Sequence, residues 1–198
     1  RGRDQAPRIS RRLSVANEVS LRATRSEILS RFHMSALQPR DVPPVTLFVM
    51  GYGHEAVIRE AIRSAFAQTY PNLEIILSDD ASSDGTYAMM EEMAAAYQGT
   101  HRIVLNRNSE NLGIMGHVNR IMELASSDWV AELGGDDLCT PDRIARQMAA
   151  LLEARSAGMN PQAVHCARQR IAPDGTLQEI RPAYPQLLRE PPPGLMET

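Results

Sequence analysis

The chain has 198 residues, of which 43% are hydrophobic and 23% charged, so it is long enough for one full-sized domain with its own core. No apolar run approaches the roughly 20 residues that span a bilayer, and no stretch has the apolar region of a signal peptide. All 21 basic residues are arginine. Without lysine, the chain can hold neither a Walker A phosphate loop nor a Schiff-base lysine.

Charge is divided unevenly along the chain. Residues 1–40 carry nine arginines against three acids, whereas the remaining residues carry twelve arginines against 21 acids. An acidic body argues against binding of nucleic acid. Residues 1–40 are predicted to form a basic arm, helical from about Ile9 to Leu37, which either connects domains or contacts an anionic membrane.

The two cysteines, Cys139 and Cys166, match no metal-ligand or redox spacing. We therefore expect them to be reduced residues of a cytoplasmic protein, held at the inner face of the membrane if the arm binds lipid. The chain begins with Arg1 rather than methionine, so we also expect it to be cut from a longer polypeptide.

After a proline-rich break at residues 38–44, apolar β-branched runs alternate with amphipathic segments. This alternation predicts an α/β fold with a mostly parallel sheet flanked by helices, since a strand–helix–strand unit joins parallel strands by a right-handed crossover. Residues 41–177 are predicted to form this domain, and the proline-rich tail, residues 178–198, has no clear element. The predicted strands span 45–50, 73–78, 102–105, 128–133 and 163–171, and the predicted helices span 54–68, 87–97, 114–125 and 141–153.

Three of the predicted strands end in distinctive turns, which are Gly51-Tyr52-Gly53, Asp79-Asp80 and Gly135-Asp136-Asp137. Ligands of an open parallel sheet bind beyond the carboxyl ends of the strands, so these turns are predicted to line one crevice. Four carboxylates would repel a bare phosphate, and we expect Mn²⁺ or Mg²⁺ to bridge Asp136 and Asp137 to a diphosphate. Asp80 could accept a hydrogen bond from a base or a ribose, and Tyr52 could stack on the base.

Each of these signals also has a simpler interpretation. Asp136-Asp137 could be a solvated turn or a helix N-cap, and Tyr52 could be a surface turn tyrosine. Residues 51–56 also fit the G-x-G-x-x-G/A fingerprint of a dinucleotide-binding loop, which would place the chain in an NAD-type oxidoreductase. Against that, a bulky Tyr52 fits badly beside a pyrophosphate, and a dinucleotide site leaves Asp136-Asp137 unexplained.

Four segments, in the same order along the chain, resemble the signature of the family 2 inverting glycosyltransferases, which have the GT-A fold. The resemblance runs from about Val45 to Asp174 and reaches neither the arm nor the tail. The segments are Ala61–Thr86, with Gln68-Thr69-Tyr70-Pro71-Asn72 and Asp79-Asp80-Ala81-Ser82-Ser83-Asp84, then Asn111-x-Gly113, Gly135-Asp136-Asp137 and Pro141-Asp142-Arg143-Ile144.

Position by position, the resemblance implies a role for each residue of the predicted crevice. Tyr52 would stack on the base, usually uracil, and Asp80 would bond that base. Asp136 and Asp137 would form the DXD-type pair. In that pair Asp137 would be the direct metal ligand, and Asp136 would bind the metal or contact the sugar or ribose.

Further positions match the family less specifically. Asn111 and Gly113 would border the nucleotide, and Asp84 also matches a family position, although helix capping accounts for it. The chain departs from the common pattern at Gly134, where many members carry another acid, and at Gly53, where asparagine is common.

The resemblance implies transfer of a sugar from a nucleotide diphosphate donor, usually UDP-linked, to the hydroxyl of a saccharide or lipid-linked acceptor, with inversion. An Asp or Glu base would deprotonate the acceptor. Family members carry that base well downstream of the Asp-Asp turn, and Glu179 and Glu190 match no motif, so we expect it beyond the end of this chain and assign no catalytic residue. We therefore expect these residues to bind nucleotide and metal but to turn over poorly. The alternatives are an NAD-type oxidoreductase domain and an inactive nucleotide-binding module of the same fold.

Overall fold

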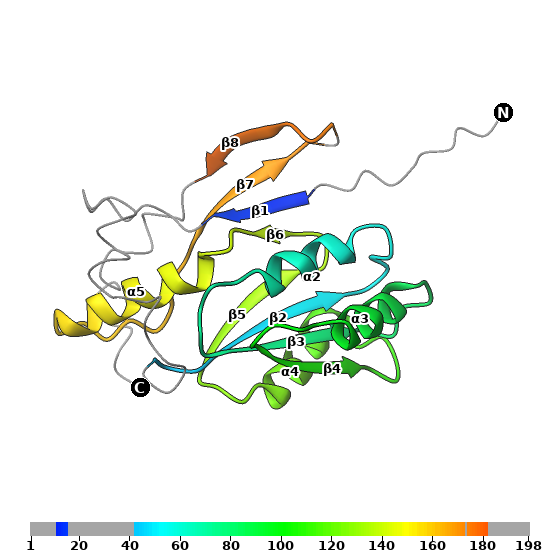
Figure 1. Cartoon of the computed structure of the whole chain (residues 1–198), viewed down its shortest axis with the longest axis horizontal. Helices are drawn as coiled ribbons and strands as arrows, with labels where there is room; N and C mark the ends of the chain where they lie inside the picture. The colour runs from blue at the N-terminus through cyan, green and yellow to red at the C-terminus, as the bar shows by residue number, and fades with distance from the viewer. Residues whose placement is uncertain (1–10, 16–41, 173, 182–198) are drawn as a thin grey trace, which may run out of the picture.

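The computed structural model describes residues 11–15, 42–172 and 174–181. Its main layer is a four-stranded sheet in the order β4-β3-β2-β5, in which all three pairings are parallel (Figure 1). The predicted α/β architecture with a parallel sheet is therefore confirmed. The strands are β2 (Val45–Gly51), β3 (Leu73–Asp79), β4 (Arg102–Arg107) and β5 (Trp129–Gly134).

Helices cover both faces of this sheet (Figure 1). Helices α2 (Ile58–Phe66) and α3 (Thr86–Ala95) pack on one face, and α4 (Gly113–Leu124) packs on the other. A further helix, α5 (Arg143–Ser156), adds Ile144, Met148 and Leu151 to the larger core.

The middle strands, β2 and β3, are buried because their side chains are apolar on both faces. Every residue of β3 is buried, and in β2 only Met50 is partly exposed. Successive side chains alternate between the faces, so Leu47 joins the core under α2 and α3, whereas Phe48 and Ile76 contact Ile121 of α4. The continuous apolar runs that predicted these strands are explained by this burial on both sides.

Helix α2 starts four residues later than the predicted His54. The backbone N–H groups of Gly53, His54 and Glu55 donate to side chains at the start of α3 and in the loop before it. Their acceptors are Ser82 Oγ at 3.0 Å, Thr86 Oγ1 at 2.8 Å and Asp84 Oδ2 at 3.2 Å. These bonds join the loop after β2 to the loop after β3.

A second, smaller sheet has the order β6-β1-β7-β8 (Figure 1). Its strands are β1 (Arg11–Val15), β6 (Leu138–Cys139), β7 (Ala167–Ile171) and β8 (Leu177–Arg181). Strand β1 pairs with β6 in parallel and with β7 antiparallel, and β7 and β8 form an antiparallel pair.

The predicted helix from Ile9 to Leu37 is wrong at Arg11–Val15, which form β1. Both pairing partners of β1 lie more than a hundred residues away, and helical spacing within the arm carries no information about them. The sequence likewise predicted no clear element at β8. This strand is defined by its pairing with β7, which the local sequence does not reveal. The rest of the arm and of the tail lies outside the described residues. The predicted domain boundaries at residues 40 and 177 stay predictions.

Within the described part of the chain, no helix is both long and apolar enough to cross a membrane.

Two isoleucines provide a matched test of this fold. Ile76 of β3 is 0% exposed and packs against Ile121 of α4, whereas Ile114 at the start of α4 is 73% exposed. Ile76→Ala should lower the free energy of unfolding by about 2–5 kcal/mol, because it leaves a cavity, and Ile114→Ala should change it by less than about 0.5 kcal/mol. Urea unfolding of both variants measures these costs, and equal effects would contradict the described core.

Candidate functional site

The three distinctive strand ends lie side by side at the carboxyl edge of the main sheet. Strand β2 pairs with β3 on one side and with β5 on the other, so Gly51 is opposite Asp79 and Met50 is opposite Gly134. The backbone contacts continue past the strands, where Asp80 N donates to Gly51 O at 3.0 Å and Gly135 N donates to Met50 O at 2.8 Å. The sequence-based prediction of a shared edge therefore holds.

Close packing makes glycine necessary at position 135. A Cβ atom there would lie 2.5 Å from His54 Nδ1 and 2.8 Å from both Ile58 Cδ1 and Met50 O. Real Cβ atoms essentially never come so close, and Met50 O is a backbone atom of β2, which cannot move aside as a flexible side chain could. The absence of a side chain lets the turn after β5 lie directly against the end of β2.

The carboxylates of Asp136 and Asp137 converge above Gly134. A Cβ atom on Gly134 would lie 3.0 Å from Asp136 Oδ1 and 3.3 Å from Asp137 Oδ2, so both oxygens approach the same point. Asp137 N closes the turn by donating to Gly134 O at 3.0 Å. The N-cap position of α5 is Asp142, so neither Asp136 nor Asp137 caps that helix.

This pair has the chemistry that a divalent cation requires. Both residues are partly exposed, and carboxylate oxygens are the ligands that Mg²⁺ and Mn²⁺ prefer. Among the described residues, no group of three His, Cys, Asp or Glu side chains is arranged to hold a metal. The pair fits a cation that takes its other ligands from a diphosphate and water, as Mg²⁺ commonly does.

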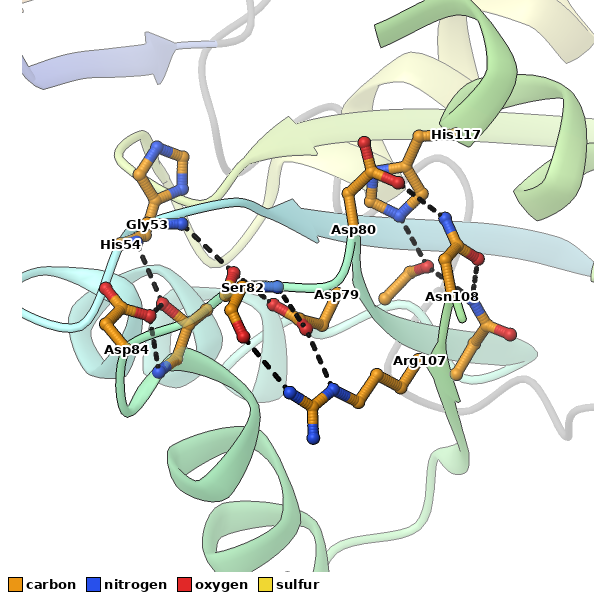
Figure 2. A network of polar contacts seen from close by, with 12 residues as sticks. Gly53, His54, Asp79, Asp80, Ser82, Asp84, Arg107, Asn108 and His117 are labelled. Atoms are coloured by element: carbon orange, nitrogen blue, oxygen red, sulfur yellow. Dashed lines mark hydrogen bonds and ion pairs between the residues drawn. The ribbon is translucent and has the colours of Figure 1, made fainter. Parts of the chain in front are cut away.

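Asp79 has a structural role and does not face a ligand. It is fully buried, its Oδ2 accepts the Ser82 N–H at 3.0 Å, and Arg107 Nε lies 3.5 Å from the same oxygen (Figure 2). Ser82 Oγ donates to its other oxygen. These contacts hold a turn in which Ala81 takes a positive φ of 59°, a conformation that residues other than glycine rarely adopt. Asp79 is thus neutralised by the protein itself.

Asp80 also receives hydrogen bonds from the protein, but on one oxygen only. Its Oδ1 accepts Asn108 Nδ2 at 2.8 Å and the Leu112 backbone N–H at 2.9 Å, whereas Oδ2 receives no hydrogen bond from the described residues. Asp80 is 3% exposed, and Figure 2 shows its second oxygen directed away from Asn108. Sequence reasoning missed Asn108, which belongs to no motif.

A buried polar chain continues from Asn108 towards α4. Asn106 Nδ2 donates to Asn108 Oδ1 at 3.0 Å and to Ser78 Oγ at 2.9 Å, and Ser78 Oγ lies 2.7 Å from His117 Nε2 (Figure 2). Since Asp80 accepts only, Asn108 and Asn106 are the donors along this chain, whereas the direction of the bond between Ser78 and His117 depends on the tautomer of the imidazole. Burial lowers the pKa of His117 below its usual value of 6.5, with Asp80 and Asp79 opposing that effect. A neutral His117 is consistent with this chain of bonds.

The remaining sequence-predicted residues surround this edge. Tyr52 follows β2 directly and is 55% exposed, so its ring is accessible beside the strand ends. Asn111 and Gly113 are exposed at the start of α4, where Asn111 Oδ1 accepts the Gly113 N–H at 2.8 Å and Gly113 has a φ of 69°. They reach Asp80 only through the intervening Leu112 N–H.

Asp84 holds the loop before α3 in place, but the N-cap residue of α3 is Gly85, so the expected helix capping by Asp84 is not observed. Its carboxylate accepts the Thr86 N–H at 3.0 Å, the Thr86 hydroxyl, and the Glu55 N–H at 3.2 Å. Burial by itself would raise the pKa of Asp84, but these hydrogen bonds outweigh it and the pKa is lowered. Asp84 is fully accounted for by this structural role.

Comparison with known proteins identifies the same region of the chain. The family model described as Glycosyl transferase family 2 matches residues 46–191. EpsE of Bacillus subtilis is 37% identical over 113 residues, which are 57% of this chain and 40% of EpsE. In Escherichia coli, the UDP-Glc:alpha-D-GlcNAc-diphosphoundecaprenol beta-1,3-glucosyltransferase WfaP is 29% identical over 104 residues, which are 52% of this chain and 39% of WfaP.

A solved structure shares the fold. The mannosyltransferase PcManGT from Pyrobaculum calidifontis, in complex with GDP-Man and Mn²⁺, is 27% identical and has a TM-score of 0.53. The match covers 59% of this chain and 34% of PcManGT. The chain thus spans less than half the length of each of these three proteins.

The buried His117 predicts a dependence of stability on pH. Its pKa is lowered by folding, so between the unfolded value of about 6.5 and the lower folded value the unfolded chain binds more protons. Stability should therefore fall as the pH drops below about 6.5 and level off below the folded pKa. His117→Gln, whose side-chain amide can still form a hydrogen bond with Ser78, should lessen this fall. Burial also lowers the pKa of His101, but this residue is present in both proteins, so its contribution cancels. Thermal midpoints between pH 5 and 8 measure the difference, and parallel curves would contradict it.

Proposed function

This chain belongs to glycosyltransferase family 2, and from that premise we propose that it binds a nucleotide diphosphate-sugar through a divalent cation held by Asp136 and Asp137. The reaction that it serves is transfer of the sugar, with inversion, to an acceptor hydroxyl. The observation that carries the proposal is the convergence of both carboxylates above Gly134, beside the end of β2.

The cation is Mn²⁺ or Mg²⁺, which when bound would neutralise the charge that develops on the departing diphosphate. Asp137 is proposed as the direct ligand, and Asp136 as a second ligand or a contact to the sugar or ribose. Among the described residues, no third His, Cys, Asp or Glu joins this pair as a metal ligand. The PcManGT structure contains Mn²⁺, which supports the choice of a divalent cation. Because Asp79 is paired with Arg107, it does not compete for the cation.

The nucleoside end of the donor is proposed to lie beside Tyr52 and Asp80. The exposed ring of Tyr52 offers a face on which a base can stack. The Oδ2 atom of Asp80 can accept a hydrogen bond from the base, and Asn111 and Gly113 border this position through Leu112. WfaP is named for UDP-Glc, which supports a UDP-linked donor, whereas PcManGT was solved with GDP-Man.

The dinucleotide alternative is not favoured by the loop that follows β2. In such a loop the backbone N–H groups must point to a pyrophosphate. Here four of them, and that of Ile58 at the start of α2, are already engaged within the protein. The N–H groups of Gly53, His54 and Glu55 donate to side chains at the start of α3 and in the loop before it, and those of Val57 and Ile58 donate to His54 O.

Several parts of the function stay proposals. The acceptor is proposed to be a saccharide or a lipid-linked saccharide, and no catalytic base is assigned, since Glu179 lies in β8 away from any motif. A cytoplasmic location and contact of residues 1–40 with an anionic membrane also stay predictions. The chain spans less than half the length of EpsE and of WfaP. We therefore propose that these residues bind donor and metal with little or no turnover of their own.

Substitution of Asp137 tests the proposed cation site. Asp137→Asn should weaken the binding of UDP in the presence of Mn²⁺ by more than about tenfold, roughly 1.4 kcal/mol, because it removes one charged ligand. Asp142→Asn is the matched control, since Asp142 is also partly exposed but lies in the next turn, at the N-cap of α5. Isothermal titration calorimetry measures both. An affinity unchanged by Asp137→Asn would remove Asp137 from the site.

A further inference from the structure

One oxygen of Asp80 is fully used by the protein. A carboxylate oxygen has two acceptor positions, and on Oδ1 these are taken by Asn108 Nδ2 at 2.8 Å and Leu112 N at 2.9 Å. Only Oδ2 receives no hydrogen bond from the described residues. A base that meets Asp80 therefore finds one oxygen able to accept and one that is saturated.

Nucleobases differ in how many N–H groups they offer to a carboxylate. Uracil presents a single N3–H, which one oxygen satisfies. Guanine presents N1–H and an N2 amino group side by side, and this pair needs both oxygens of a carboxylate. A buried N–H group left without an acceptor costs affinity, so a half-saturated Asp80 should take the single donor and gain nothing from the second.

We propose that Asn108 is a specificity-determining residue, which occupies Asp80 Oδ1 so that the site accepts a base with one imino N–H, such as uracil, and derives no benefit from the amino group of guanine. This inference rests on the proposed function, in which Asp80 faces the base. It adds a residue that no motif marks and assigns it to the choice of base rather than to the reaction.

A hydrogen bond from Asn106 fixes the orientation of the Asn108 side chain, which makes Asn108 suited to this role. Its amide oxygen accepts Asn106 Nδ2 at 3.0 Å, and Asn106 uses its second amide proton on Ser78 Oγ at 2.9 Å. Ser78 in turn contacts the buried His117 at 2.7 Å (Figure 2). With the amide oxygen held, Asn108 cannot turn it towards Asp80, and Nδ2 stays on Oδ1.

Inosine diphosphate (IDP) distinguishes the effects of the two N–H groups of guanine. Its base, hypoxanthine, keeps N1–H and lacks the N2 amino group. The affinities of UDP, GDP and IDP, each with Mn²⁺, are measured by calorimetry or by displacement of UDP. For the unmodified chain we expect GDP to bind no more tightly than IDP, because the N2 amino group of guanine finds no free acceptor on Asp80. In Asn108→Ala, which opens Oδ1, GDP should bind about tenfold more tightly than IDP, the gain expected for one satisfied N–H.

Asn160→Ala is the matched control, since Asn160 is exposed and lies outside the network. The comparison of GDP with IDP in the unmodified chain needs no variant, so the test survives if Asn108→Ala fails to fold. The proposal is overturned if GDP already binds the unmodified chain about tenfold more tightly than IDP, or if a folded Asn108→Ala binds the two equally. It is also overturned if neither purine nucleotide displaces UDP from either protein, because pocket size would then set the choice. A failure of UDP itself to bind would instead contradict the proposed function.

Discussion

The close approach of Gly135 to the end of β2 fixes the geometry of the whole edge. Its N–H group donates to Met50 O at 2.8 Å, and no side chain could fit between this turn and His54. Because β2 lies between β5 and β3, the same residue holds the Asp136-Asp137 turn near the acidic end of β3. A change that pushed this turn away would separate the proposed cation site from the proposed base site.

The four acids at this edge differ in how far the protein itself pairs their carboxylates. Asp79 is compensated by Arg107 and Ser82, and one oxygen of Asp80 is compensated by Asn108 and Leu112. Among the described residues, no third His, Cys, Asp or Glu joins Asp136 and Asp137 in a metal cluster. In the proposed function a cation binds at that end of the edge, and the base of the donor meets Asp80 at the other end.

The sequence was sufficient to predict the strands that are buried on both faces, because such strands are continuous apolar runs. The continuous apolar runs of β2 and β3 marked both strands, and their acidic or glycine ends marked the edge. It was insufficient where a distant partner decides the conformation, as for β1, whose helical prediction failed because β6 and β7 pair with it. Asn108 was also missed. Its one signal is that Asn106 and Asn108 are two residues apart, which places their side chains on the same face of the extended chain.

A thermal-shift titration with UDP and with NAD, each with and without Mn²⁺, tests the central claim most directly. A ligand at about 100 times its dissociation constant adds about 2.7 kcal/mol to the stability of the folded state, which should raise the midpoint by several degrees in a chain of this size. The metal-bridged donor site predicts a shift with UDP that requires Mn²⁺ and no shift with NAD. A metal-independent shift with NAD would contradict it and make the Gly51-Tyr52-Gly53 loop a dinucleotide site.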